Sequence, residues 1–286
     1  MAFRNYRDAA DAFNDGRYWH SFIHKTTAPT ISTGRWGDMA MGAGTPVYQP
    51  YVGNQWEATA LNGQKNQGIH TGPVPPAGMD KYLAKLSLTT PSTTGLPYTA
   101  WLCDYLLYYP LIDGDSTDEQ VMDNTVTLPR YTDGVGVQAF LVTMSPVVAD
   151  CDVVIKFVGT DDVERTVTQR IWQSGNLANL LNLDRTGTTA NLNNCPFIRI
   201  GDAKGIKRIT SVTHLAGVGG LYTIVLVKPI TTMLMREGLA MTEHCYLTQR
   251  LSLPEIQPGA YLNMLMYVGA ASNPGVIRGQ LDFIWG

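Results

Sequence analysis

After Pro129 the chain is a succession of short apolar runs separated by turn residues, and this pattern restricts the possible fold more than any other feature. No helical segments alternate regularly with these runs, so a parallel sheet built from βαβ units is disfavoured. Short strands with turn chemistry between them favour an antiparallel β-sandwich or jelly roll. The runs expected to form strands are residues 135–144, 152–158, 164–172, 197–200, 207–214, 222–228, 247–253, 261–268 and 276–285.

Two turns in this half predict β-hairpins. Residues 159–162 (GTDD) separate the second and third runs, and residues 217–220 (GVGG) separate the fifth and sixth. Glycine and aspartate accept the backbone angles that tight hairpin turns require. Residues 177–183 (LANLLNL) are compatible with a loop or a single helical turn, because asparagine is a poor helix former.

The first half contains fewer such runs. A short helix is expected at residues 5–14, with Gly16 placed to end it, followed by an extended stretch at 17–31. Residues 81–90 alternate apolar and polar side chains and predict a strand. Residues 100–109 form an apolar, aromatic run that fits a buried strand or a short helix.

Residues 34–76 combine two properties that seldom occur together. Glycine, proline and asparagine recur throughout this tract, yet it also carries Trp36, Tyr48, Tyr51 and Trp56. Aromatic rings bring enough apolar area to offset the entropy lost on ordering. We therefore expect an extended arm that lies either on its own body or on a neighbouring subunit. The four rings are its candidate partner-contact anchors, with a sugar-stacking platform as the alternative.

These elements predict an all-β protein in two parts. Residues 1–78 are expected to hold the N-terminal helix and the extended arm, and residues 79–286 the sandwich or jelly-roll body. Closely spaced strand candidates begin near residue 129, which makes this position a second possible domain boundary.

Composition argues against several classes of partner and compartment. Charged residues make up 16% of the chain, the net charge is −3, and no basic run is present, so a nucleic-acid interface is disfavoured. The N-terminus lacks the apolar core of a secretory signal. The longest apolar runs, such as residues 221–227, are far too short for a membrane span.

Candidate chemical sites are weak. His20 and His24 lie four residues apart but lack a third metal ligand, and residues 113–119 (DGDSTDE) depart from the EF-hand pattern. A looser calcium site at this acidic loop stays open. Cys103, Cys151, Cys195 and Cys245 have no paired spacing, which favours buried free thiols. No nucleophile or dinucleotide motif is present. We therefore expect no enzyme, no cofactor and no assigned metal site.

Four segments together resemble a family of tailed-bacteriophage virion structural proteins. They are FRNYRDAADAFNDGR near the N-terminus, the tract beginning GRWGDMAMGAG, the run AWLCDYLLYYPLIDGDSTDEQ, and the ending GVIRGQLDFIWG. The resemblance implies a role in the virion, as a capsid cement, decoration or other minor head protein. It carries no catalytic residues. Because no secretory signal is predicted, the chain is expected to be made in the host cytoplasm and not exported by a signal.

The expected function is therefore structural. The chain would bind the outer capsid surface and bridge neighbouring major capsid subunits, with a trimer or another closed ring as its own assembly. A tail, neck or baseplate protein and a carbohydrate-binding sandwich for host attachment are the alternatives. Deletion of the residues before Ser32 is expected to spoil assembly while leaving the β body folded.

Overall fold

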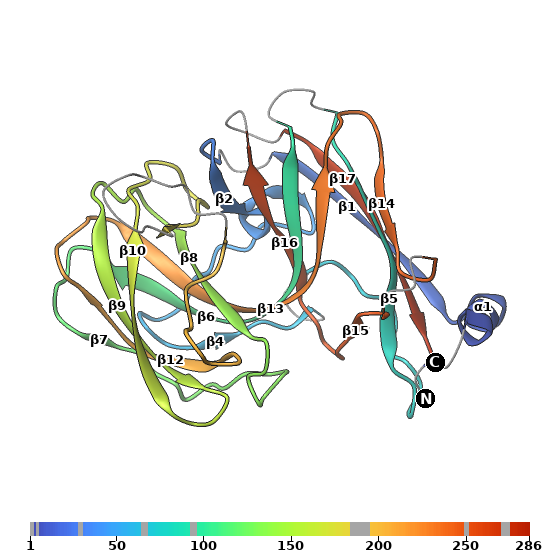
Figure 1. Ribbon diagram of the computed structural model, residues 1–286, viewed down its shortest axis with the longest axis horizontal. Coiled ribbons are helices and arrows are strands. Elements are labelled where there is room, and N and C mark those ends of the chain that lie inside the picture. The colour runs from blue at the N-terminus through green and yellow to red at the C-terminus, as the bar shows by residue number, and fades with distance from the viewer. Residues whose placement is uncertain are drawn as a thin grey trace.

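Three antiparallel sheets and one short α-helix make up most of the regular structure in the described part of the chain, which confirms the predicted all-β class. A computed structural model describes residues 3, 6–27, 31–63, 68–91, 96–183, 195–248, 252–269 and 275–286. Figure 1 shows two lobes, with both termini at the far end of the lobe that carries the helix. Two of the strands are long enough to reach from one lobe into the other, so one sheet contributes to both lobes.

The first sheet, sheet A, has the strand order β14-β5-β17-β1-β3, with β15 paired to β5. All its pairings are antiparallel. The helix α1 (Tyr6–Asn14) packs on its outer face, where Ala9 joins Tyr82 and Ile284 in a small apolar cluster. The strands are β1 (Tyr18–Thr27), β3 (Ala43–Thr45), β5 (Lys81–Thr89), β14 (Thr242–Cys245), β15 (Glu255–Ile256) and β17 (Ile277–Trp285).

Sheet B lies between the other two sheets and has the order β2-β16-β6-β13-β8, with β4 paired to β6. A short 3₁₀ helix, η1 (Met39–Met41), follows β2. The strands are β2 (Arg35–Asp38), β4 (Thr59–Ala60), β6 (Tyr98–Asp113), β8 (Gln138–Thr143), β13 (Leu221–Met235) and β16 (Leu262–Val268).

Sheet C forms the second lobe with the order β11-β10-β9-β12-β7. The strands β9 and β10 form the hairpin predicted at residues 159–162, with Glu164 opposite Val158. The strands are β7 (Gln120–Val121), β9 (Cys151–Gly159), β10 (Glu164–Ile171), β11 (Asn182–Leu183) and β12 (Ile206–His214).

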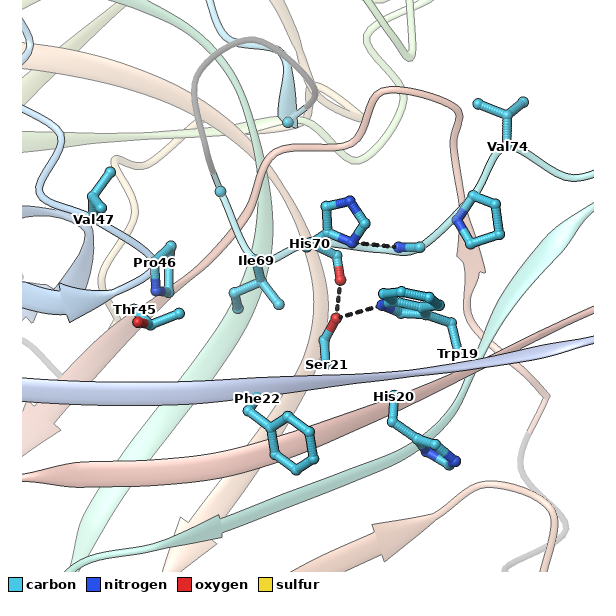
Figure 2. A pocket seen from close by; sticks show the side chains of 14 residues that line it. Trp19, His20, Ser21, Phe22, Thr45, Pro46, Val47, Ile69, His70 and Val74 are labelled. Atoms are coloured by element: carbon cyan, nitrogen blue, oxygen red, sulfur yellow. Dashed lines mark hydrogen bonds between the residues drawn. The ribbon is translucent and has the colours of Figure 1, made fainter.

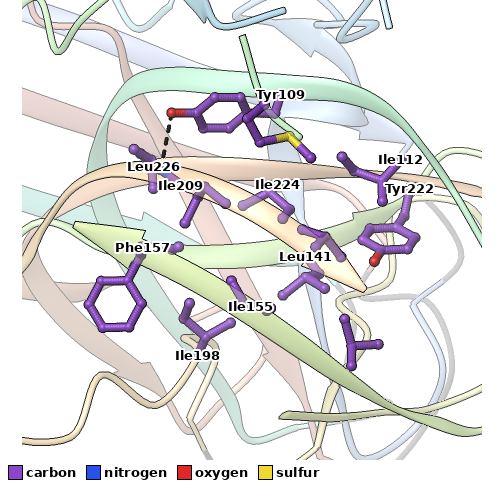
Figure 3. Close-up of a cluster of buried hydrophobic side chains, with 14 of the residues drawn as sticks. Tyr109, Ile112, Leu141, Ile155, Phe157, Ile198, Ile209, Tyr222, Ile224 and Leu226 are labelled. Carbon is purple, nitrogen blue, oxygen red and sulfur yellow. Dashed lines mark hydrogen bonds between the residues drawn. The ribbon is translucent and has the colours of Figure 1, made fainter. Parts of the chain in front are cut away.

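The long strands β6 and β13 join the two lobes, because they pair along nearly their whole length. One end of β6, with Ala100 and Leu102, contributes to the core shared with sheet A. Its other end, with Leu107 and Tyr109, contributes to the core shared with sheet C. Figure 3 shows this second core, in which Ile224 of β13 lies among side chains from both sheets.

The opposite face of sheet B carries a third core. Side chains alternate along a strand, so Cys103 and Tyr105 point away from the core that holds Leu102. Segments from the aromatic tract cover this face, and their buried members include Trp36 and Tyr51. The tract is therefore ordered by lying on its own body, one of the two alternatives that its composition allowed.

Arg130 and Asp104 form a buried ion pair inside the protein. Arg130 makes two hydrogen bonds to the Asp104 carboxylate, at 2.7 and 2.8 Å, and also donates to the carbonyls of Leu61 and Tyr105. Asp104 further accepts a hydrogen bond from the Tyr261 N–H. Four segments that are distant in sequence thus meet at one guanidinium and one carboxylate.

Three sequence expectations fail in detail. Residues 217–220 do not form a hairpin, because β12 belongs to sheet C and β13 to sheet B. Gly219 and Gly220, both at φ 73°, turn the chain from one sheet to the next. Residues 197–200 form no strand, although Ile198 donates a hydrogen bond to Ala139. No strand spans 247–253 as expected, but residues 249–251 lie outside the described part.

Candidate functional site

Three of the four candidate anchors face the protein's own interior. The exposed fraction is 5% for Trp36 and 0% for Tyr51, and the Trp36 ring packs 5.5 Å from that of Tyr267. Trp56 is half-buried and donates from its indole nitrogen to Gln120 at 2.9 Å. Tyr48 alone is well exposed, at 47%. The prediction that these rings dock on a partner is therefore wrong for Trp36 and Tyr51, and the same burial removes a sugar platform made of all four.

Asp38 explains why Tyr51 turns inward. Its buried carboxylate accepts hydrogen bonds from the Tyr51 hydroxyl at 2.5 Å, the Tyr105 hydroxyl at 2.8 Å and the Ala40 N–H at 2.9 Å. Burial raises the pKa of Asp38, while the two hydroxyl groups act in the opposite direction. A buried carboxylate must find such donors, so Asp38 fixes the aromatic tract to sheet B.

A matched pair of Tyr→Phe substitutions tests this assignment. Tyr51→Phe removes one of three donors from a buried carboxylate, and we expect the free energy of unfolding to fall by about 1–3 kcal/mol. Tyr48→Phe alters an exposed ring and should change it by less than about 0.5 kcal/mol. Urea denaturation of both variants provides the measurement. Equal effects of the two substitutions would contradict the inward assignment of Tyr51.

Two lysines hold the tract at further points. The Lys25 ammonium, fully buried, donates to the carbonyls of Gly42 at 3.0 Å and Pro46 at 2.6 Å. The Lys81 ammonium donates to the carbonyls of Thr71 and Pro73, each at 2.6 Å. Desolvation lowers the pKa of both lysines to about 8. Each lysine thus fastens a loop with little regular structure to a sheet strand.

These pKa values predict a pH dependence of stability. Between pH 8 and the ordinary lysine value of 10.5, the unfolded chain binds more protons at Lys25 and Lys81 than the folded chain does. The contribution of these groups to stability therefore rises with pH in that window. We expect the rise in the free energy of unfolding from pH 8 to pH 9.5 to be smaller in Lys25→Met than in the unmodified protein. A variant with an unchanged or steeper rise would refute the assignment.

An open groove lies between the two fastened loops and β1. Its volume is about 930 Å³, and Figure 2 shows its walls, with Pro46 and Val47 at one end and Val74 at the other. Ser21 and Trp19 lie on the side of His70, whereas His20 and Phe22 lie on the opposite side of β1. Phe22 is 66% exposed, and Val74 60%. The groove is thus a preformed, largely apolar depression along one strand.

The loop that carries His70 and Gly72 forms the roof of the groove, and side-chain contacts connect it to β1. The Trp19 indole donates to the Ser21 hydroxyl, which in turn donates to the His70 carbonyl. Gly72, at φ 81°, lies so close to the Trp19 ring that an added Cβ would meet its Cγ at 2.4 Å. A side chain at position 72 would displace this ring, so glycine keeps the roof and the indole in contact.

The main chain of β1 offers hydrogen bonds toward this groove. The Arg17 carbonyl accepts from the Trp285 N–H, so odd-numbered residues of β1 direct their polar groups to β17. Even-numbered residues face the other edge, where His24 lies opposite Thr45 of β3. The described pairings of β3 begin only at His24. Tyr18, His20 and Phe22 therefore present their N–H and C=O groups to an edge without a described strand partner.

Other candidate sites do not assemble. His20 and His24 lie on a strand rather than a helix, about 13 Å apart along it, and His20 Nδ1 contacts Asp282 at 2.7 Å. In the acidic loop, Asp113 accepts from the Asp115 N–H, and Glu119 pairs with Lys156 at 2.8 Å. Within the described residues, no three side chains of His, Cys, Asp or Glu are grouped to hold a metal ion.

The four cysteines differ in how far they are buried. Cys103 and Cys151 are buried, while Cys245 is half-buried and Cys195 exposed. The expectation of buried thiols is therefore confirmed for two of the four. No helix in the described ranges is long and apolar enough to cross a membrane.

Comparisons with known proteins add little. No protein-family model and no curated protein matches the chain. A structure of the infectious bursal disease virus Gt strain is 12% identical, covering 94% of this chain and 80% of that one, with a TM-score of 0.17. The VP2 subviral particle of the same virus is 11% identical, with the same coverages and a TM-score of 0.16. At such scores the likeness carries no argument about fold or function.

Proposed function

We propose that this chain is a structural protein of a virus particle, which binds the outer capsid surface and bridges neighbouring major capsid subunits. The open edge of β1, with exposed apolar side chains around it, is the observation that carries the proposal. The resemblance of four sequence segments to virion structural proteins of tailed bacteriophages supports the choice of partner.

The surface around the groove has the properties of a contact site. Exposed apolar side chains gather along β1 and the two loops beside it, and an apolar patch with polar surroundings is typical of interaction surfaces. Its members are Tyr18, Trp19, Phe22, Val47, Tyr48 and Val74, each at least 38% exposed. A rigid β body with such a patch can join subunits through buried area without any chemical step.

The size of the interface follows from the proposed role. A protein that holds a shell together needs an obligate contact, of about 2,000 Å² or more in total. The groove supplies only part of such an area, so further surfaces of the chain take part. Closed symmetry of the shell favours a trimer or another ring of this chain.

Purified particles provide the test. We expect quantitative mass spectrometry to find the chain in intact virions and in DNA-free heads, in a fixed ratio to the major capsid protein. A reconstruction of the head by electron microscopy should place the β body on the outer surface. Its absence from particles would overturn the proposal. Its presence in tails but not in heads would select the alternative of a tail, neck or baseplate protein.

A further inference from the structure

We infer that the open edge of β1 receives an extended segment of a neighbouring virion protein, which adds a strand to sheet A beside residues 18–22. This inference rests on the proposed function and names the kind of partner that the groove takes. It goes beyond apolar contact, because it assigns a row of main-chain hydrogen bonds to the interface.

Main-chain groups of β1 that have no strand partner among the described residues are the first observation behind this inference. The hydrogen bond from the Trp285 N–H to the Arg17 carbonyl shows that odd-numbered residues of β1 face β17. Tyr18, His20 and Phe22 therefore direct their N–H and C=O groups away from β17. Figure 2 looks onto this edge of β1, with side chains leaving it on two sides. Six polar groups in a row form a template for another strand.

The neighbouring strand β3 cannot fill this edge. It ends at Thr45, and Pro46 has no N–H to continue a ladder. Lys25 then holds the Pro46 carbonyl, which fixes the loop at the end of the groove. At the other end, Lys81 holds the carbonyls of Thr71 and Pro73. The two loops held by Lys25 and Lys81 therefore keep this edge of β1 open. An incoming strand would pair with β1 next to the end of β3.

The lining defines the chemistry of the occupant. Among the described residues that form the groove, none carries a carboxylate, an ammonium or a guanidinium group. A charged side chain of the partner would lose water here without gaining a counter-charge. The apolar side of the groove, with Trp19, Ile69 and Val47, fits apolar side chains at alternate positions of the partner. The occupant is thus an uncharged segment with apolar residues at every second position.

The area of the contact indicates that the segment belongs to a larger, attached protein. Five residues of strand span only about 17 Å, so the area that they can bury is far short of the roughly 800 Å² per partner that an independent complex needs. An arm already held nearby in a shell binds through its high effective concentration. A second copy of this chain is a poorer donor, because each strand in its described part is already paired within its own sheets.

A proline substitution at His20 tests the inference. His20→Pro removes an N–H that faces the open edge and leaves the β1–β17 hydrogen bonds intact. His20→Ala is the matched control, since it loses the same contact to Asp282 but keeps the N–H. In particles assembled with equal amounts of both variants, we expect His20→Pro to be incorporated about tenfold less than His20→Ala.

Hydrogen exchange of the unmodified protein gives a second readout that does not depend on how the proline variant folds. Amide exchange of the segment containing Tyr18, His20 and Phe22 should be at least about tenfold slower in particles than in the isolated protein. Equal incorporation of the two variants, with no added protection, would overturn the inference while the proposed function stands. If the chain in all its forms is missing from particles, the proposed function fails first and the inference with it.

Discussion

Deletion of residues 1–31 should prevent sheet A from forming, rather than leave a folded body that fails to assemble. The reason is that β1 lies between β17 and β3 and pairs with β17 over eight residues. Its Ile23 side chain belongs to the core between sheets A and B, and Lys25 fastens the loop at Pro46. We expect loss of the cooperative thermal transition, measured by circular dichroism and calorimetry. This corrects the expectation, drawn from sequence, that the body tolerates the deletion.

Deletion of residues 1–16 is the matched control. It removes α1, which covers only the outer face of sheet A at Tyr82 and Ile284, and leaves every strand in place. A cooperative transition at a lower temperature is expected, because some apolar surface becomes exposed. If the longer deletion unfolds with the same cooperativity as the shorter one, β1 is dispensable and the argument from strand order is wrong.

Substitution Arg130→Met should lower the free energy of unfolding by about 3–5 kcal/mol. The carboxylate of Asp104 is fully buried, and burial raises its pKa even though Arg130 opposes that shift. Without the guanidinium, Asp104 keeps one donor among the described residues, the Tyr261 N–H. The carbonyls of Leu61 and Tyr105 lose a donor at the same time. Urea denaturation at pH 7 provides the measurement.

The double variant Arg130→Met with Asp104→Asn separates charge from packing. It removes the unpaired carboxylate, so we expect it to recover part of the lost stability. The single variant should also be less impaired at lower pH, where Asp104 takes up a proton and loses its charge. A loss below about 1 kcal/mol in the single variant would show that the pair contributes little to the stability of the fold.

Local sequence patterns predicted several elements well. The run at residues 81–90 forms β5 and the run at 261–268 forms β16, and both strands are buried along nearly their whole length rather than on one face alone. The helix at residues 5–14 was confirmed within one residue, with Gly16 at φ 72° just beyond its end. Residues 100–109 were ambiguous because they are apolar on both faces. The structure explains this, since β6 lies between two cores.

The groove illustrates what local patterns miss. The aromatic residues of β1 were visible in the sequence as Tyr18, Trp19 and Phe22, within a stretch expected to be extended. Tyr18 and Phe22 alternate with Ser21 and Ile23 and therefore share one face of the strand, whereas Trp19 lies on the other. The glycine-rich tract instead favours Trp36 and Tyr51 as contact residues, but both rings are buried, and Tyr51 donates to the buried carboxylate of Asp38. Neither outcome follows from composition, because each depends on contacts that form only in the folded chain.

By itself, the sequence determined that this protein is built from antiparallel strands, that it has a short helix at its start, and that its aromatic tract needs a surface to lie on. Those properties follow from side-chain periodicity and local backbone preferences, which act over a few residues. Only the tertiary structure decided which surface the tract covers and which edge of β1 stays open. Strand order joins residues more than a hundred positions apart, as where β1 pairs with β17, and no short stretch of sequence encodes such pairings.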